Sequence, residues 1–172
     1  MTSFAEIPIG TFELRPFSVV GNEKMILTAM KRDGSTNLMT VSWGGFGVMW
    51  GSPVVFYAVR PERHTFSFTE EGEKISLSVL ETKYAPILSY CGTHSGKDED
   101  KLKGSGLHPI RLFNGQIGYE EARLIITAKK CYSAPLDKKG FKEKEYTERW
   151  YGEKGGYHTL YFSAIEKIYR RN

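Results

Sequence analysis

The sequence predicts a mainly β protein, an antiparallel Greek-key barrel with a few short helices. Two observations predict this fold: short runs rich in β-branched and aromatic residues dominate the 172-residue chain, and turn residues separate most of these runs. Strands that alternate with long helices would instead indicate βαβ units. The length suits one domain, expected over residues 1–172, with a core that needs no disulfide or structural metal.

Composition excludes several classes of protein. Apolar residues make up 40% of the chain, and no apolar run approaches the roughly 20 residues that a membrane span needs. The N-terminus lacks the basic and apolar regions of a secretory signal, so we expect a cytoplasmic protein. Acidic residues are interleaved with the basic ones, which argues against nucleic-acid binding. The net charge of +4 instead suits an anionic cofactor.

Three strands are expected in the first 60 residues. They cover residues 24–31, 36–43 and 54–59. The first strand ends at a turn in which Gly34 can take a positive φ angle. The third is an uninterrupted apolar run that ends at Arg60-Pro61, as in a strand buried on both faces.

Short helices and one alternating strand are expected next. A helix over residues 66–71 follows Thr65, whose hydroxyl is a candidate N-cap. Residues 74–80 alternate apolar and polar side chains, the period of a strand with one buried face. Apolar side chains at helical spacing predict a helix over residues 83–91 that ends at a glycine, and residues 98–103 predict a polar helical turn.

Two further strands are expected in the last third of the chain. They cover residues 123–130 and 157–169, and the second alternates strictly in its side chains. A charged stretch over residues 137–150 lies between them. Since mostly turns and only two or three short helices separate the expected strands, the pattern favours an antiparallel barrel over alternating βαβ units.

A segment with two glycines resembles a phosphate-binding P-loop but misses its pattern twice. Residues 91–98 read Cys-Gly-Thr-His-Ser-Gly-Lys-Asp, with three residues instead of four between the glycines and an aspartate after the lysine. Small and hydroxylated residues run into a helix start with Lys97 and Lys101 close by, which predicts an anion-binding nest. An ordinary glycine-capped helix end explains the segment alone equally well.

A second candidate for phosphate binding follows the third strand. Residues 60–65 read Arg-Pro-Glu-Arg-His-Thr and bring two arginines to a helix N-terminus. Guanidinium groups bind phosphate through paired hydrogen bonds, and a helix N-terminus adds free amides. A solvated arginine pair, with Glu70 and Glu71 as partners, is the alternative.

The second strand mixes polar and apolar residues without a clean buried face. A flavin ring has donors and acceptors along one edge and a broad apolar plane. Strand amides together with Met39 and Trp43 suit such a ring. A barrel strand with Trp43 in the core is the alternative.

The remaining reactive residue types indicate no site. The four histidines show no spacing typical of metal ligands. Cys91 and Cys131 belong to no CxxC pair and are expected to be free thiols, and a pairing of Cys91 with His94 lacks a third member. No catalytic residue and no metal ligand is therefore assigned.

Four segments, in their order and spacing, resemble the flavin-reductase-like FMN-binding split-barrel family, and within it the flavoredoxin group. The segments cover residues 37–45, 60–65, 89–98 and 157–161. Two features depart from the family pattern. Residues 161–164 read Tyr-Phe-Ser-Ala where a Gly-Glu pair is expected after the aromatic pair, and Lys97 stands where an arginine is commoner.

The resemblance implies a split barrel that forms a homodimer and holds FMN non-covalently near the subunit interface. It implies that residues 37–43 line the flavin ring, that the arginine segment and the Ser-Gly loop hold the phosphate, and that His158 borders the open ring face. Packing of His158 within the barrel is the alternative. The residues expected to bind the cofactor are Asn37, Met39, Thr40, Val41, Ser42, Trp43, Arg60, Arg63, Thr65, Ser89, Cys91, Gly92, Thr93, Ser95, Gly96, Lys101 and His158.

The function expected from these features is that of an FMN-binding oxidoreductase, a flavin reductase-like enzyme. NAD(P)H would reduce the bound flavin, which would pass its electrons to an acceptor. The flavin carries the redox chemistry, so the protein needs no obligatory catalytic acid. The alternatives are an electron-transfer protein of the flavoredoxin type with a redox-protein partner, and a non-catalytic flavin-binding protein.

Overall fold

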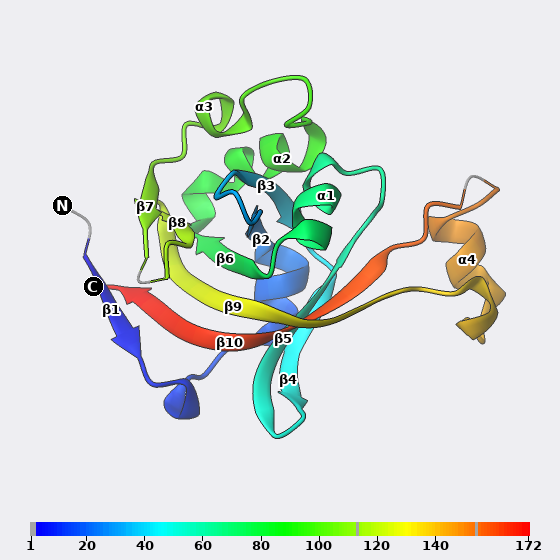
Figure 1. Cartoon of the computed structure of the whole chain (residues 1–172), viewed down its shortest axis with the longest axis horizontal. Helices are drawn as coiled ribbons and strands as arrows, with labels where there is room; N and C mark the ends of the chain where they lie inside the picture. The colour runs from blue at the N-terminus through cyan, green and yellow to red at the C-terminus, as the bar shows by residue number, and fades with distance from the viewer. Residues whose placement is uncertain (1–2, 113, 154) are drawn as a thin grey trace.

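A computed structural model describes residues 3–112, 114–153 and 155–172, and an antiparallel sheet dominates it (Figure 1). The strands are β1 (Phe4–Ile7), β2 (Met25–Met30), β3 (Thr36–Val41), β4 (Gly44–Met49), β5 (Ser52–Val59), β6 (Lys74–Leu80), β7 (Pro109–Arg111), β8 (Ile117–Tyr119), β9 (Ala122–Pro135) and β10 (Thr159–Arg171). The α-helices are α1 (His64–Glu71), α2 (Ala85–Thr93), α3 (Lys101–Ser105) and α4 (Lys144–Trp150). Shorter or wider helical turns are η1 (Ile9–Thr11), η2 (Ser18–Glu23), η3 (Thr82–Tyr84) and η4 (Lys138–Gly140). The predicted mainly β class is confirmed.

The main sheet has the order β3-β2-β6-β9-β10-β5-β4, and β1 pairs with β10 outside this path. The order is not sequential because β2 pairs with both β3 and β6, while β10 joins β9 to β5. Strand β3 stands at one end of the order and pairs with β2 alone. One long edge of β3 is therefore open to other groups, and the candidate site lies along it.

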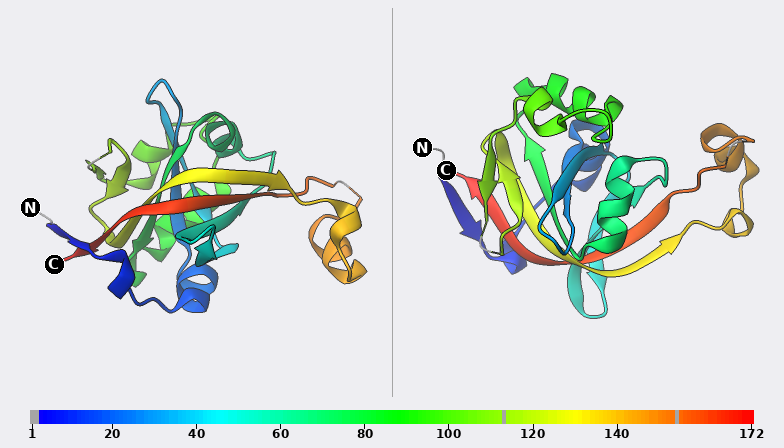
Figure 2. Two further views of the ribbon diagram at one scale, coloured as in Figure 1. Left: turned by 60° about the horizontal axis from the view of Figure 1, so that its bottom comes forward. Right: turned by 45° about the horizontal axis from the view of Figure 1, so that its top comes forward.

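Two apolar clusters lie on opposite faces of the curled sheet. Alternate residues of β2 show the division, since Leu27 belongs to the cluster inside the curl and Ile26 to the cluster beneath α2 and α3. Figure 2 shows these two helices on the outer side of the strands. Helix α2 thereby holds its C-terminal end beside β3, where Leu38 belongs to the second cluster.

Strand β6 has the predicted bounds, but the prediction of one buried face is wrong. Ser76 and Ser78 are as buried as the apolar residues between them. The separate β7–β8 hairpin covers this side, and the Ser76 hydroxyl donates a hydrogen bond to the carbonyl of Ile117. The serines on this face of β6 are therefore buried where the β7–β8 hairpin packs closely against the strand.

Several predicted boundaries move in the structure. Helix α1 begins at His64, so Thr65 lies inside its first turn and does not cap it; the N-cap residue, Arg63, makes no side-chain cap bond. Helix α2 runs past the predicted end to Thr93. The turn expected over residues 98–103 is α3, which begins at Lys101 after Asp100 accepts a hydrogen bond from the Lys103 amide.

The longest strands, β9 and β10, pair along most of their length (Figures 1 and 2). The connection between them, residues 136–158, is called the excursion here and carries η4 and α4. It contains the charged stretch for which the sequence indicated no element. Among the described residues, no helix combines the length and the apolar character needed to cross a membrane.

Candidate functional site

Two pockets lie along the open edge of β3 and meet at Arg63. The first, the loop pocket, has a volume of about 190 Å³. The predicted residues that line it are Asn37, Arg63, Thr65, Gly92, Thr93, Ser95, Gly96 and Lys101. The second, the aromatic pocket, has a volume of about 170 Å³. The predicted residues that line it are Met39, Thr40, Val41, Ser42, Trp43, Arg60, Arg63 and His158.

Two predicted residues, Ser89 and Cys91, line neither pocket. Ser89 is exposed on α2, and its carbonyl accepts a hydrogen bond from the Thr93 hydroxyl. Cys91 is fully buried in the cluster beneath α2, where burial raises the pKa of its thiol. Cys91 is connected to the loop pocket by its carbonyl, which accepts hydrogen bonds from Lys101 and Arg63, two residues that line the pocket.

Two cations converge on that carbonyl at the C-terminal end of α2. The ammonium of Lys101 donates hydrogen bonds of 2.8 Å to the carbonyls of Cys91 and Leu38, and the Arg63 guanidinium donates one of 3.4 Å to Cys91. Lys101 is only 3% exposed, and burial lowers its pKa to about 8. Burial also lowers the pKa of Arg63. Poorly solvated cations at a pocket wall favour an anion in that pocket.

A close contact between β3 and the loop after α2 forms one wall of the loop pocket. The Asn37 amide donates a hydrogen bond of 2.8 Å to the Thr65 hydroxyl, which explains why Thr65 is buried inside α1. A Cβ atom placed on Gly96 would lie 2.3 Å from the Asn37 side-chain oxygen. Only glycine leaves room for this approach, so Gly96 has a steric requirement that the sequence pattern alone did not explain.

The open edge of β3 directs main-chain groups into the site. The Leu38 carbonyl faces away from β2, because it accepts hydrogen bonds from Lys101 and, at 3.4 Å, from Thr65. Peptide groups alternate in direction along a strand, so the main chain of Thr40 faces the same open side. Thr40 lines the aromatic pocket, where its main-chain groups are placed for a ligand with donors and acceptors along one edge.

An aromatic row borders the aromatic pocket. The ring of Trp43 lies 4.5 Å from His158 and 4.8 Å from Trp150, measured between ring centroids. Trp43 is therefore a half-buried wall residue and not part of the barrel core. His158 is buried against it, and burial lowers its pKa to about 4, so the imidazole is neutral near pH 7. Its Nδ1 atom lies 2.9 Å from the Tyr151 hydroxyl.

The two predicted arginines separate in the structure. Arg63 lines both pockets, whereas Arg60 lines only the aromatic pocket. The Arg60 guanidinium donates a hydrogen bond of 2.5 Å to the Trp150 carbonyl and lies 5.3 Å from the centre of the Tyr151 ring. Arg60 therefore connects the excursion to the site. Sequence reasoning missed Trp150 and Tyr151, for which two adjacent aromatic residues at the end of a charged stretch were the only signal.

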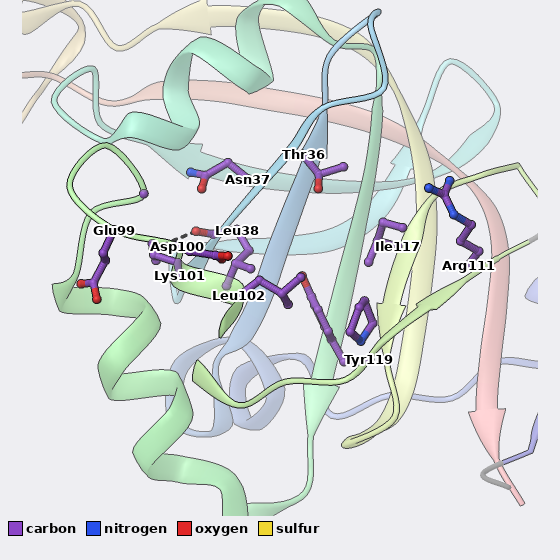
Figure 3. A pocket seen from close by; sticks show the side chains of 12 residues that line it. Thr36, Asn37, Leu38, Glu99, Asp100, Lys101, Leu102, Arg111, Ile117 and Tyr119 are labelled. Atoms are coloured by element: carbon purple, nitrogen blue, oxygen red, sulfur yellow. Dashed lines mark hydrogen bonds between the residues drawn. The ribbon is translucent and has the colours of Figure 1, made fainter. Parts of the chain in front are cut away.

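A larger cavity, of about 430 Å³, adjoins the loop pocket and shares Asn37, Gly96 and Lys101 with it. Figure 3 shows its walls, with Thr36 and Asn37 of β3 on one side and Arg111 and Ile117 of the β7–β8 hairpin opposite. No pattern in the sequence indicated this cavity. Within the described part of the chain, no three His, Cys, Asp or Glu side chains gather as ligands for a metal ion.

Comparison with known structures shows the same fold. The chain resembles an FMN-binding domain of a flavin reductases-like enzyme from Shewanella baltica, with 12% identity, a TM-score of 0.68, and coverage of 98% of this chain and 78% of that one. It also resembles the flavoredoxin of Desulfovibrio vulgaris (Miyazaki F), with 18% identity, a TM-score of 0.65 and coverage of 95% and 75%. An NADH:FAD oxidoreductase from Streptomyces globisporus has 14% identity, a TM-score of 0.64 and coverage of 87% and 77%.

A comparison with curated protein sequences finds no significant match. The family model described as "Flavin reductase like domain" matches residues 18–171, which include both pockets and the strands around them. The match confirms the resemblance indicated by the four sequence segments. The chain belongs to the flavin reductase like family.

Proposed function

We propose that the chain is an FMN-binding oxidoreductase in which the loop pocket holds the phosphate and the aromatic pocket holds the flavin ring. The observation that carries this proposal is the junction of a cationic pocket and an aromatic pocket at Arg63, along one open strand edge. Membership of the flavin reductase like family supports the flavin, and FMN is the form with a single terminal phosphate.

The residues present fit both ends of FMN. Lys101 and Arg63 supply charge for the phosphate, and the contact of Gly96 with Asn37 keeps side-chain bulk out of the loop pocket. The main chain of Thr40 faces the polar edge of a ring, and Trp43 supplies apolar surface beside it. When bound, FMN would supply the redox chemistry, and the protein would supply binding and orientation.

We further propose that NAD(P)H reduces the bound flavin, which then passes electrons to an acceptor. Neutral His158 and the aromatic row give the pocket an apolar border, which suits the approach of a planar donor. The competing function is electron transfer with a redox-protein partner, which the likeness to a flavoredoxin favours.

Titration of the flavin-free protein tests the proposed function. FMN should bind more tightly than riboflavin, because the loop pocket adds contacts to the phosphate. Arg63→Ala should lose roughly 1–3 kcal/mol of FMN binding, the range for a charge-assisted hydrogen bond, with little change for riboflavin. Arg32→Ala, at an exposed turn, is the matched control. Equal affinities for FMN and riboflavin in the unsubstituted protein would refute the proposal.

Anaerobic mixing with NADH or NADPH then separates the two functions. Loss of the oxidised-flavin absorbance within seconds supports the reductase. An unchanged spectrum over minutes, with prompt reduction by a reduced protein donor, supports the electron-transfer function instead.

A homodimer is also part of the proposal. Exposed apolar side chains gather near the tip of the β4–β5 hairpin: Val48 is 70% exposed, Trp50 62% and Tyr132 51%, and the rings of Trp50 and Tyr132 lie 6.3 Å apart. A second copy of the chain would remove this surface from water.

Light scattering tests the dimer. The unsubstituted protein should have about twice the monomer mass of 19.5 kDa, and Trp50→Asp should have the monomer mass. Aspartate tolerates the positive φ of 51° at this position, so the change tests association and not the turn. Tyr146→Asp, at an exposed aromatic residue of α4, should leave the dimer intact. A monomeric unsubstituted protein with FMN bound would contradict the proposal.

A further inference from the structure

Trp150 is the exposed end of the aromatic row that borders the aromatic pocket. Its side chain is 42% exposed, while His158, on the far side of Trp43, is 9% exposed. The rings of Trp43 and Trp150 meet at an interplanar angle of 89°. A partly exposed aromatic surface is therefore held against Trp43 and Arg60, two residues that line the pocket proposed for the flavin ring.

Long-range contacts fix the position of Trp150. Its carbonyl accepts the hydrogen bond from Arg60, which lies 90 positions earlier in the chain. The next residue, Tyr151, is buried and contacts both Arg60 and His158. The end of α4 is thus attached to Arg60 of the barrel at two points, and the Trp150 ring packs against Trp43. An aromatic side chain fixed in this way binds a ligand at a low entropic cost.

A guanidinium lies against the exposed ring of Trp150. The guanidinium of Arg149 lies 5.3 Å from the centre of the Trp150 ring, and Arg149 is itself exposed. Arg60 lies on the carbonyl side of the same residue. An aromatic surface with an exposed arginine beside it favours a ligand that combines a planar ring with anionic groups, such as a dinucleotide, over a neutral quinone.

We propose that Trp150 and Arg149 form a subsite for the electron donor, a reduced nicotinamide dinucleotide, with Trp150 against a planar ring and Arg149 toward the phosphates. The proposal rests on the proposed function, in which the flavin ring occupies the aromatic pocket. It assigns donor binding to the excursion, whereas all the residues proposed for FMN except His158 lie in the barrel, in α1, in α2 and in the segment from α2 to the start of α3.

Donor binding and flavin reduction are measured separately in the FMN-loaded protein. Anaerobic stopped-flow mixing with increasing NADH or NADPH gives the donor dissociation constant and the limiting reduction rate. Trp150→Ala should raise the dissociation constant about 3- to 10-fold, the range for one aromatic contact, and leave the limiting rate unchanged. Trp150→Phe should restore most of the affinity. Arg149→Gln should weaken donor binding and reduce its dependence on salt.

A second readout does not depend on turnover. NAD⁺ or NADP⁺, which does not reduce oxidised flavin, is titrated into the FMN-loaded protein while tryptophan fluorescence is followed. Trp150→Ala should weaken this binding as well, whereas Tyr146→Ala, on the same helix and 57% exposed, should not. The FMN dissociation constant should be the same in all these variants.

Two outcomes would overturn the subsite. One is donor and product binding unchanged in both Trp150→Ala and Arg149→Gln. The other is a lower limiting rate in Trp150→Ala with unchanged donor affinity, which would make Trp150 a structural residue. Failure of the unsubstituted protein to bind FMN would instead refute the proposed function, so the two failures are distinguishable.

Discussion

The loop pocket and the aromatic pocket share Arg63 but are built in different ways. The loop pocket joins the open edge of β3 to the beginning of α1 and the end of α2, and a buried ammonium on two carbonyls holds it together. Part of the aromatic pocket's border comes from the excursion, whose Trp150 is partly exposed and attached through Arg60.

The difference teaches which part of the site tolerates change. A buried cation has no freedom to move away from its two carbonyls, so the loop pocket is preorganised for one kind of group. The row beside the aromatic pocket ends in a connection between strands, where sequence changes are tolerated more readily than in the sheet. We expect cofactor affinity to depend on the loop pocket and the choice of second substrate to depend on the excursion.

The largest expected effect comes from closing the loop pocket with a single methyl group. Gly96→Ala would place a Cβ atom 2.3 Å from the Asn37 oxygen, so either Asn37 or the loop must move. Movement of Asn37 would break its hydrogen bond to Thr65 and distort the pocket wall. We expect FMN affinity to fall at least tenfold and the free energy of unfolding to fall by about 1–3 kcal/mol, as in other overpacked sites.

The control is Gly47→Ala, because a Cβ atom there meets no atom within 4 Å. Calorimetry of binding and urea unfolding measure the two quantities. If Gly96→Ala binds FMN as tightly as the Gly47 variant does, the loop pocket is not the phosphate site.

The next effect is a dependence of FMN affinity on pH, which we expect from Lys101 in the loop pocket. The pKa of Lys101 is lowered by burial from 10.5 to about 8, so the folded flavin-free protein loses this proton at lower pH than the unfolded chain does. FMN affinity should fall as pH rises above 8, by up to tenfold per pH unit, because the phosphate then meets a neutral amine. Fluorescence titrations between pH 7 and 9.5 measure it.

Lys101→Met separates this effect from other titrations, because it removes the titrating group and keeps a long apolar side chain. Its FMN affinity should be lower at pH 7 and nearly flat with pH. Between pH 8 and 10.5 the unfolded chain binds more protons at this position, so Lys101 should make the flavin-free protein more stable as pH rises. That rise should be missing in the variant. An unchanged FMN profile would place Lys101 outside the phosphate site.

The same contrast explains what could be predicted from the sequence. Strands β2, β3, β5, β6, β9 and β10 followed from local patterns, and so did the two candidate phosphate-binding segments, because each of these features consists of consecutive residues. The cofactor-binding residues along β3 and in the two segments were expected from the resemblance to the flavin-reductase-like family. Thr65 was misjudged because its hydrogen-bond partner, Asn37, lies 28 positions away. A local pattern contains no information about such a partner.

The excursion shows the same limit more strongly. Trp150 and Tyr151 follow a run of charges that is typical of a solvated segment, and nothing nearby in the sequence indicates a contact with Arg60. The pairing of β9 with β10 returns the end of the excursion to the barrel. This pairing places Trp150 and His158 beside Trp43, which lies more than 100 positions earlier in the chain. Residues placed by long-range pairing need a structure before they can be assigned to a site.

The smallest expected effect tests whether the two arginines have the different roles that the structure gives them. Arg60→Ala removes the hydrogen bond to Trp150 and the cation beside Tyr151, so the excursion should open more often. Since Arg60 is partly exposed, we expect a cost of about 1 kcal/mol, equivalent to roughly fivefold faster amide hydrogen exchange in residues 144–151. The preference for FMN over riboflavin should stay within about twofold of the unsubstituted protein, unlike in Arg63→Ala. Exchange in β6 serves as an internal control, because that strand lies in the core. If Arg60→Ala instead weakens FMN but not riboflavin and leaves exchange in the excursion unchanged, Arg60 is a phosphate ligand, as the sequence motif first indicated, and the division between the two pockets fails.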